Sequence, residues 1–235
     1  MTRCQYALII QLLTRCQLWI TGNGKEEIVF KGTPALITQR REEIISACEK
    51  LYQTKSFREI TLKDIGNETS FSRPTIYNYF QTKEEIFLAL FESEYKRWNE
   101  DLEKILREND QLTRAQIAEK IGHSLEKREQ LLKLLSMNNY DMEANSRPEL
   151  LTAFKEAYGK SMENIRSILY RFCPDISEEE IENCIYVFYP FMFGIYPYTN
   201  VTEKQKTAMK DAQVDFVSHS IYEITYNCLI RLLDQ

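Results

Sequence analysis

The feature that most constrains the fold is a run of closely spaced helix-start signals within residues 61–85. Thr61 and Asp64 have the spacing of a capping box, in which the threonine oxygen accepts a backbone N–H and the carboxylate bonds back. Ser72 followed by Pro74 gives a second start, because proline is favoured in the first turn of a helix. The chain must therefore form two short helices in close succession.

The residues that follow complete the pattern. Residues 69–71, Thr-Ser-Phe, lack helical periodicity, so the chain is expected to turn there. Thr82 and Glu85 form another capping box, which opens a third and longer helix. Short helix, tight turn and short helix make a helix-turn-helix, a shape that fits the major groove of DNA, about 12 Å wide.

The rest of the chain reads as helix as well, because no segment alternates convincingly as a strand. We predict an all-α fold with about nine helices beyond residue 36: an N-terminal three-helix helix-turn-helix head, then a larger helical ligand-binding and dimerisation domain. Capping boxes and apolar spacing place the later helices at 83–107, 113 to a break at Gly122, 125–137, 146–172, 177–196 and 202–233.

Length and composition agree with a soluble protein that has a real core. The chain has 235 residues, of which 43% are hydrophobic, and only seven glycines and six prolines, so long loops are not expected. The formal net charge of −5 argues against a general nucleic-acid coat protein, although a local basic surface can still bind a specific DNA sequence.

Roughly residues 38–98 resemble the DNA-binding domain of the TetR (tetracycline-repressor) family of bacterial regulators. The pattern is specific because it fixes the spacing of several elements at once. It is carried by Thr38-Gln-Arg-Arg, Ile44, Cys48, Leu51, Phe57, Ile60, Thr61, Asp64-Ile65, Ser72, Thr75-Ile-Tyr-Asn-Tyr-Phe and Lys83-Glu84. The resemblance implies a cytoplasmic homodimeric repressor that binds a palindromic operator in double-stranded DNA and is released by an unknown small-molecule effector. It divides the chain into residues 37–83, the DNA-binding domain, and 84–235, the effector-binding and dimerisation domain.

The resemblance also assigns roles in DNA binding. Hydroxyls and an ammonium near phosphates would fix the register on DNA without reading the sequence, and this role falls to Thr61, Thr75, Tyr79 and Lys83. Side chains that can bind base edges or a thymine methyl would read the sequence, and this role falls to Arg73, Pro74, Tyr77 and Asn78. Tyr77 and Tyr79 have core packing as the alternative.

Two features depart from the family pattern. The family usually has alanine where this chain has Gly66, and Ala-Gly-Val where it has residues 69–71. Glycine inside a helix costs about 1 kcal/mol relative to alanine, and a non-glycine residue at a left-handed turn position costs a similar amount. We therefore expect a slightly strained turn.

The resemblance implies further sites in the larger domain. The dimer interface would use apolar stripes of the last two helices, namely Ile181, Ile185, Phe188, Met192, Val217, Ile221, Ile224 and Cys228. The effector pocket would use aromatic and methionine side chains suited to an apolar or aromatic ligand, namely Met137, Tyr140, Phe154, Tyr158, Met162, Tyr189, Phe193 and Tyr196. Packing inside one subunit is the alternative for both sets.

Other functional classes have less support. We expect no enzyme and no cofactor, because no phosphate-binding glycine loop or nucleophile elbow occurs, and no metal site, because neither the six cysteines nor the two histidines have ligand spacing. We expect the cysteines to be free thiols; a redox pair of Cys173 and Cys184 stays open. A family member that has lost operator binding and acts as a protein-binding co-regulator is the alternative function.

Residues 1–36 lie before the resemblance. Their apolar run, Tyr6–Leu13, is too short for a transmembrane helix, which needs about 20 apolar residues, and lacks a signal-peptide cleavage site. Lys25-Glu26-Glu27 is what a purine-rich ribosome-binding sequence would encode. Our hypothesis is that part of this extension reflects a mis-set start, with an authentic non-ATG start near Val29 or Leu36; a basic arm or an amphipathic helix packed on the head is the alternative.

Overall fold

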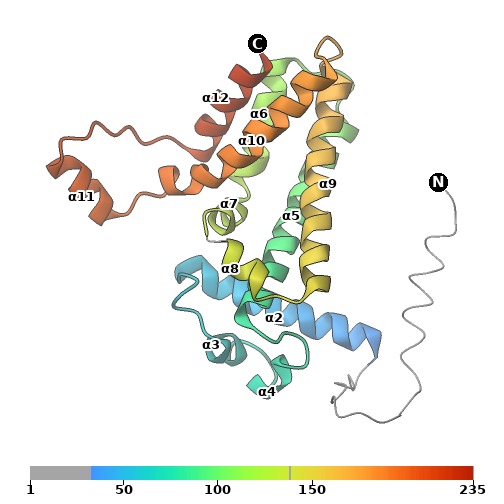
Figure 1. Cartoon of the computed structure of the whole chain (residues 1–235), viewed down its shortest axis with the longest axis vertical. Coiled ribbons are helices and arrows are strands. Elements are labelled where there is room, and N and C mark those ends of the chain that lie inside the picture. The colour runs from blue at the N-terminus through green and yellow to red at the C-terminus, as the bar shows by residue number, and fades with distance from the viewer. Residues whose placement is uncertain (1–32, 138, 235) are drawn as a thin grey trace, which may run out of the picture. The chain divides into compact units, whose positions relative to one another are not determined.

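The computed structural model describes residues 33–137 and 139–234, and its regular structure is helical there, as predicted (Figure 1). These residues form α2 (Pro34–Thr54), α3 (Leu62–Asn67), α4 (Arg73–Ile76), α5 (Lys83–Glu108), α6 (Arg114–Glu126), α7 (Glu129–Leu135), α8 (Asn139–Ala144), α9 (Pro148–Phe172), α10 (Glu178–Thr199), α11 (Glu203–Asp211) and α12 (Ile221–Leu233). Thr33 caps α2, so residues 34–36 belong to the first helix and not to the extension. The hypotheses about residues 1–32 lie outside the described residues.

Side-chain capping sets most of the helix starts. The predicted boxes at Thr61/Asp64, Thr113/Gln116, Ser177/Glu180 and Thr202/Gln205 are all complete, with both reciprocal hydrogen bonds present. Two predictions of this kind are wrong in part. Ser72 occupies the N-cap position of α4 without a capping hydrogen bond. Thr82 caps α5, but the Glu85 carboxylate does not bond back to it, because that carboxylate binds Gln81 N–H and Arg147 instead.

The predicted helix over residues 202–233 is wrong. The chain leaves the helix after Asp211, Gln213 takes a φ of 56°, and residues 212–220 are not helical. Ser220 and Glu223 then form a fifth capping box, which opens α12. In Figure 1, α11 stands away from the other helices on two extended connections, and none of its residues is buried.

The break predicted at Gly122 is also wrong. α6 runs through Gly122 to Glu126, and a separate short helix, α7, follows at Glu129. Gly122 instead allows a close approach of α12, because a Cβ built there would lie 3.0 Å from Cδ2 of Tyr222. The glycine is therefore a packing residue between two helices.

Two parts of the described chain can be distinguished. The head comprises α2, α3 and α4, in which α3 packs on both α2 and α4. In the body, α5 and α9 run side by side, α12 lies against α6 and α10, and α10 also packs on α7 and α9. α2 contacts α5, so the head adjoins the body at the start of α5. None of the helices described here has the length and apolar character needed to cross a membrane.

Two of the glycines inside helices of the body, Gly122 and Gly159, allow a matched test of packing. Nothing lies within 4 Å of a Cβ placed at Gly159 in α9, so Gly159→Ala should raise the free energy of unfolding by about 1 kcal/mol through helix propensity. Gly122→Ala gains the same propensity but must push Tyr222 aside, so it should fall below Gly159→Ala in stability. Urea unfolding followed by circular dichroism measures both, and equal gains would contradict the packing role of Gly122.

Candidate functional site

The turn between α3 and α4 is built without left-handed backbone. Gln213 is the one non-glycine residue with positive φ among the described residues, so the predicted strain at a left-handed position in 69–71 is absent. The Thr69 hydroxyl instead lies 3.0 Å from the Gly66 carbonyl oxygen, and Ser70 N–H donates to Glu43 of α2. Gly66 lets α4 approach α3, because a Cβ there would lie 3.3 Å from the Cβ of Arg73.

The four predicted base-reading residues all lie on the exposed surface of the head. Arg73, Pro74, Tyr77 and Asn78 follow one another on α4 and the turn after it. Arg73 Nη2 donates to the Tyr77 hydroxyl at 3.1 Å, so guanidinium and phenol form one hydrogen-bonded unit. Tyr77 is 41% exposed, while its neighbours Ile76 and Phe80 are buried, as expected for core residues. Packing alone therefore does not account for Tyr77.

Of the four predicted phosphate anchors, the two threonines reach the surface, whereas Tyr79 and Lys83 make contacts within the protein. Thr61 is exposed and Thr75 half-buried. Tyr79 is buried, and its hydroxyl accepts from Arg40 at 3.5 Å. Lys83 Nζ donates to the Phe57 carbonyl at 2.7 Å and lies 4.0 Å from the centre of the Phe57 ring. Lys83 thus ties the start of α5 to the loop before α3.

A buried ion pair joins head and body. The Glu85 side chain, 1% exposed, accepts from Arg147 Nε at 2.7 Å, from Arg147 Nη2 at 3.1 Å and from Gln81 N–H at 2.7 Å. Arg147 Nη2 also donates to the Tyr79 carbonyl at 2.9 Å, just after α4. Burial acts to raise the pKa of Glu85, but these hydrogen bonds outweigh it and hold that pKa below its ordinary value of 4.5. We call this cluster the junction.

The junction could not be predicted from the sequence, because residues 85 and 147 are far apart in the chain and the spacing of Glu85 from Thr82 indicated a capping box instead. A second polar contact lies at the other end of the head, where Lys133 of α7 donates to the carbonyl oxygens of Tyr52 and Lys55. The Tyr52 hydroxyl lies 2.9 Å from Met137 Sδ. The end of α2 is therefore held by the same body segment that contains a predicted effector residue.

The predicted effector residues meet only in part. Phe154, Tyr158 and Tyr189 belong to an aromatic cluster together with Phe91, Tyr95 and Trp98 of α5. Met137, Met162 and Tyr196 are half-buried and pack against the core of the chain. Two assignments are wrong: Tyr140 is 86% exposed on α8, and Phe193 lies on the exposed side of α10, so neither belongs to the cluster.

The predicted dimer stripe on α10 is wrong. Ile181, Ile185, Phe188 and Met192 are fully buried within one chain, so they cannot also contact a second copy. Val217 lies outside any helix. On α12, Ile224 and Cys228 are half-buried and Ile221 is nearly buried. The opposite side of α10 is exposed and apolar instead, and it carries Tyr186, Val187, Pro190, Phe193, Pro197 and Tyr198. We call this side the α10 face.

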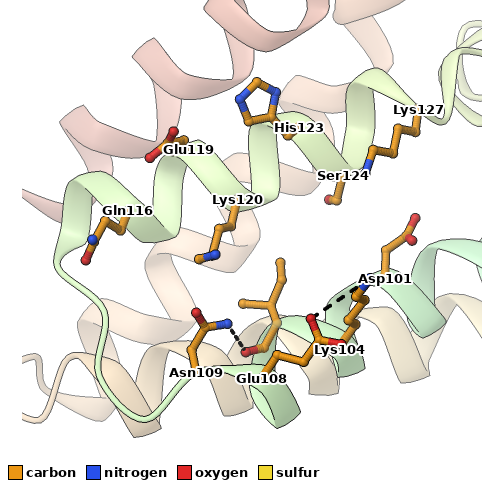
Figure 2. A pocket seen from close by; sticks show the side chains of 11 residues that line it. Asp101, Lys104, Glu108, Asn109, Gln116, Glu119, Lys120, His123, Ser124 and Lys127 are labelled. Atoms are coloured by element: carbon orange, nitrogen blue, oxygen red, sulfur yellow. Dashed lines mark hydrogen bonds and ion pairs between the residues drawn. The ribbon is translucent and has the colours of Figure 1, made fainter.

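A hollow of about 370 Å³ lies elsewhere, between the end of α5 and α6 (Figure 2). Figure 2 shows acidic, basic and amide side chains from both helices around it, including Asp101, Lys104, Glu119 and Lys120. None of the predicted effector residues lines it. Its polar, mixed-charge wall does not suit an apolar ligand.

The cysteines of the described region are not joined by a disulfide. Cys48, Cys173, Cys184 and Cys228 are free. Burial raises the pKa of Cys173, and it raises that of Cys184 to about 12, so both stay protonated and unreactive at neutral pH. No cluster of potential metal ligands occurs among the described residues.

The junction predicts a pH dependence of stability. Because the pKa of Glu85 is lowered on folding, its stabilisation is full above about pH 4.5 and is lost as the pH falls through the folded value. Glu85→Gln should cost about 3 kcal/mol at pH 7, and this cost should shrink as the pH falls below 4.5 and through the lowered pKa of Glu85. Urea unfolding across this pH range measures the difference. Glu84→Gln, at a half-buried position without an ion pair in the described part of the chain, is the control; a pH-independent loss for Glu85→Gln would contradict the assignment.

Comparisons with known proteins agree with the geometry of the head. Over 58 residues the chain is 38% identical to the HTH-type transcriptional regulator EthR of Mycolicibacterium smegmatis, a segment covering 25% of this chain and 27% of that protein. The chain thus matches about a quarter of the length of such curated relatives.

Solved structures share the fold. PfmR of Thermus thermophilus, a TetR-family transcriptional regulator, superposes with a TM-score of 0.57 at 14% identity, covering 80% of this chain and 97% of that one. FadR of Thermus thermophilus, a TetR-family repressor solved with lauroyl-CoA, gives 0.55 at 20% identity, covering 83% and 93%.

Family models cover most of the described chain. Residues 44–90 match the model described as bacterial regulatory proteins, tetR family. Residues 92–220, more than half of the chain, match the tetracyclin repressor-like C-terminal domain. The first match contains α3, α4 and the junction residue Glu85, and the second contains the aromatic cluster from Tyr95 onward and the α10 face. The chain belongs to the TetR family of transcriptional regulators.

Proposed function

We propose that this regulator is a homodimeric repressor that binds a palindromic operator through α4 and leaves it when a small apolar molecule binds in the body. The observation that carries the proposal is the exposed surface of α4, where Arg73, Tyr77 and Asn78 lie side by side without being needed for the core. Arginine and asparagine can each bind a base in the major groove through two hydrogen bonds.

The proposed domain division follows from the same contacts. We place the DNA-binding domain at residues 37–83, extended to Pro34 where α2 begins, and the effector and dimerisation domain at 84–235. Because α5 begins at Lys83 and continues into the body, a tilt of α5 would move the head. The junction would transmit such a tilt to α4, because Arg147 of the body donates a hydrogen bond to the Tyr79 carbonyl just after α4.

The α10 face is our candidate for the dimer interface. Its apolar side chains are exposed in a single chain, although adjacent Ile185 and Phe188 are fully buried on the other side of the helix. A contiguous exposed apolar surface of this kind marks an interaction site. Ile224 and Cys228 of α12 lie half-buried beside α10, which would let two helices from each copy form a four-helix contact. Two heads related by a two-fold axis would read a palindrome.

The effector is proposed to bind at the aromatic cluster between α5, α9 and α10. Its rings provide apolar surface, and Met162 on α9 provides an adaptable side chain nearby. The FadR of Thermus thermophilus was solved with lauroyl-CoA, whose acyl chain is apolar. We propose no catalytic role for these residues. A chain that binds a protein partner rather than an operator is the alternative, and the exposed Arg73–Tyr77 unit argues against it.

DNA binding can be tested with Tyr77→Ala and Asn78→Ala. Genomic fragments recovered with the purified chain should contain a palindrome, and each substitution should weaken binding to it by about 5- to 150-fold, because one base contact is worth about 1–3 kcal/mol. Tyr140→Ala, the same change at an exposed tyrosine of the body, is the control. Lys83→Ala is less informative, because it also removes the contacts with Phe57. Recovery of no palindrome would favour the protein-binding alternative.

Dimerisation can be tested with Tyr186→Glu. A charge on the α10 face should convert the dimer to a monomer, because an unpaired carboxylate would be buried between the two copies. Sedimentation velocity measures the mass, and circular dichroism checks that the helices persist. Tyr140→Glu should remain a dimer; a Tyr186→Glu variant that stays dimeric would show that the copies meet elsewhere.

A further inference from the structure

One polar atom at the centre of the aromatic cluster has no partner. Tyr95 lies on α5 and its side chain is fully buried, yet its hydroxyl makes no hydrogen bond within the described residues. Buried polar groups are nearly always paired, because leaving one unpaired costs free energy. Two other side-chain atoms share this state, Gln130 Nε2 on α7 and Thr225 Oγ1 on α12, but neither belongs to the aromatic cluster.

The side chains around Tyr95 include aromatic rings. Its ring lies 5.3 Å from that of Phe91, 6.0 Å from that of Phe154 and 5.6 Å from that of Tyr158. Two other polar atoms of the cluster are satisfied by short side-chain contacts. The Tyr189 hydroxyl donates to Ser161 Oγ at 2.8 Å, and Trp98 Nε1 donates to Ser124 Oγ at 2.9 Å. The cluster thus holds a fully buried O–H donor that has no partner among the described residues and is surrounded by aromatic rings.

We propose that the Tyr95 hydroxyl is the polar anchor of the effector and donates to the carbonyl oxygen of an uncharged, apolar molecule. This inference rests on the proposed function and specifies its ligand. A carboxylate would fit poorly, because a buried charge needs more than one neutral donor. The nearby cation, Lys155, lies 5.2 Å from the centre of the Phe154 ring but is exposed and paired with Glu143.

The ligand would enter the cluster at Tyr158. It is only half-buried on α9, and its ring stands edge-on between those of Tyr95 and Tyr189, 5.6 and 5.5 Å from them. A change of its side-chain rotamer would open the Tyr95 hydroxyl to a molecule entering beside α9, without moving the buried Tyr189. The ligand's ring or chain would then take the place of the Tyr158 ring against Tyr95 and Tyr189.

The test uses two probes that differ in one carbonyl group, 4-phenyl-2-butanone and butylbenzene. Binding is followed through Trp98 fluorescence in the full chain carrying Trp19→Phe, since the Trp98 ring contacts both Tyr95 and Tyr189. The ketone should bind about fivefold more tightly than the hydrocarbon, and Tyr95→Phe should abolish that preference without weakening hydrocarbon binding. No ketone binding, or an unchanged preference in Tyr95→Phe, would overturn the proposal.

A second measurement asks whether the hydroxyl is unpaired in the free protein. Tyr95→Phe should keep or raise Tm, whereas Tyr189→Phe, which breaks the bond with Ser161, should lower it by about 2–4 °C. An equal loss of Tm in both variants would overturn the proposal. Operator binding is measured on the same proteins. A chain that keeps the ketone preference but binds no operator would refute the proposed function and leave the anchor standing.

Discussion

The buried contact between Glu85 and Arg147 is the constraint on which the arrangement of head and body depends. A carboxylate that is 1% exposed must keep its partners, because an isolated buried charge is far more costly than a broken surface pair. Those partners come from both sides: the Gln81 N–H belongs to the chain after α4, and Arg147 precedes α9. The position of α4 relative to α9 therefore depends on hydrogen-bond geometry in addition to the apolar packing of α5 on α9.

The polar junction is also suited to switching between two arrangements of head and body. Moving a two-state equilibrium from 1:99 to 99:1 requires about 5.5 kcal/mol of differential ligand binding. Hydrogen bonds to charged groups contribute about 1.5–3 kcal/mol each, so loss of two or three of them at the junction is of the right size. Thr82 Oγ1 adds a contact to the Asn145 carbonyl at 3.0 Å, which places two neighbouring residues of the loop before α9 against the start of α5.

The sequence predicted local structure better than it predicted partners. Capping boxes need only residues three positions apart, so Thr61/Asp64 and Ser177/Glu180 were readable, and Ser220/Glu223 could have been found by the same rule. The stripe of Ile181, Ile185 and Phe188 was correctly periodic but was assigned to a dimer, because periodicity shows that a face is covered and not by what. The unpaired hydroxyl of Tyr95 could not be predicted, since it is visible only when its neighbours are placed in space.

α11 differs from the other described helices in that none of its side chains is buried. A nine-residue helix with no buried side chain has little beyond its Thr202/Gln205 cap and local ion pairs such as Lys206 with Glu203 to hold it, so its helix–coil equilibrium should lie near balance. Its opening would therefore be independent of the core and close to zero in free energy. In evolutionary terms, this is where the chain can gain, lose or exchange residues at least cost, so related sequences should vary in length between residues 200 and 220 before they vary anywhere in the body.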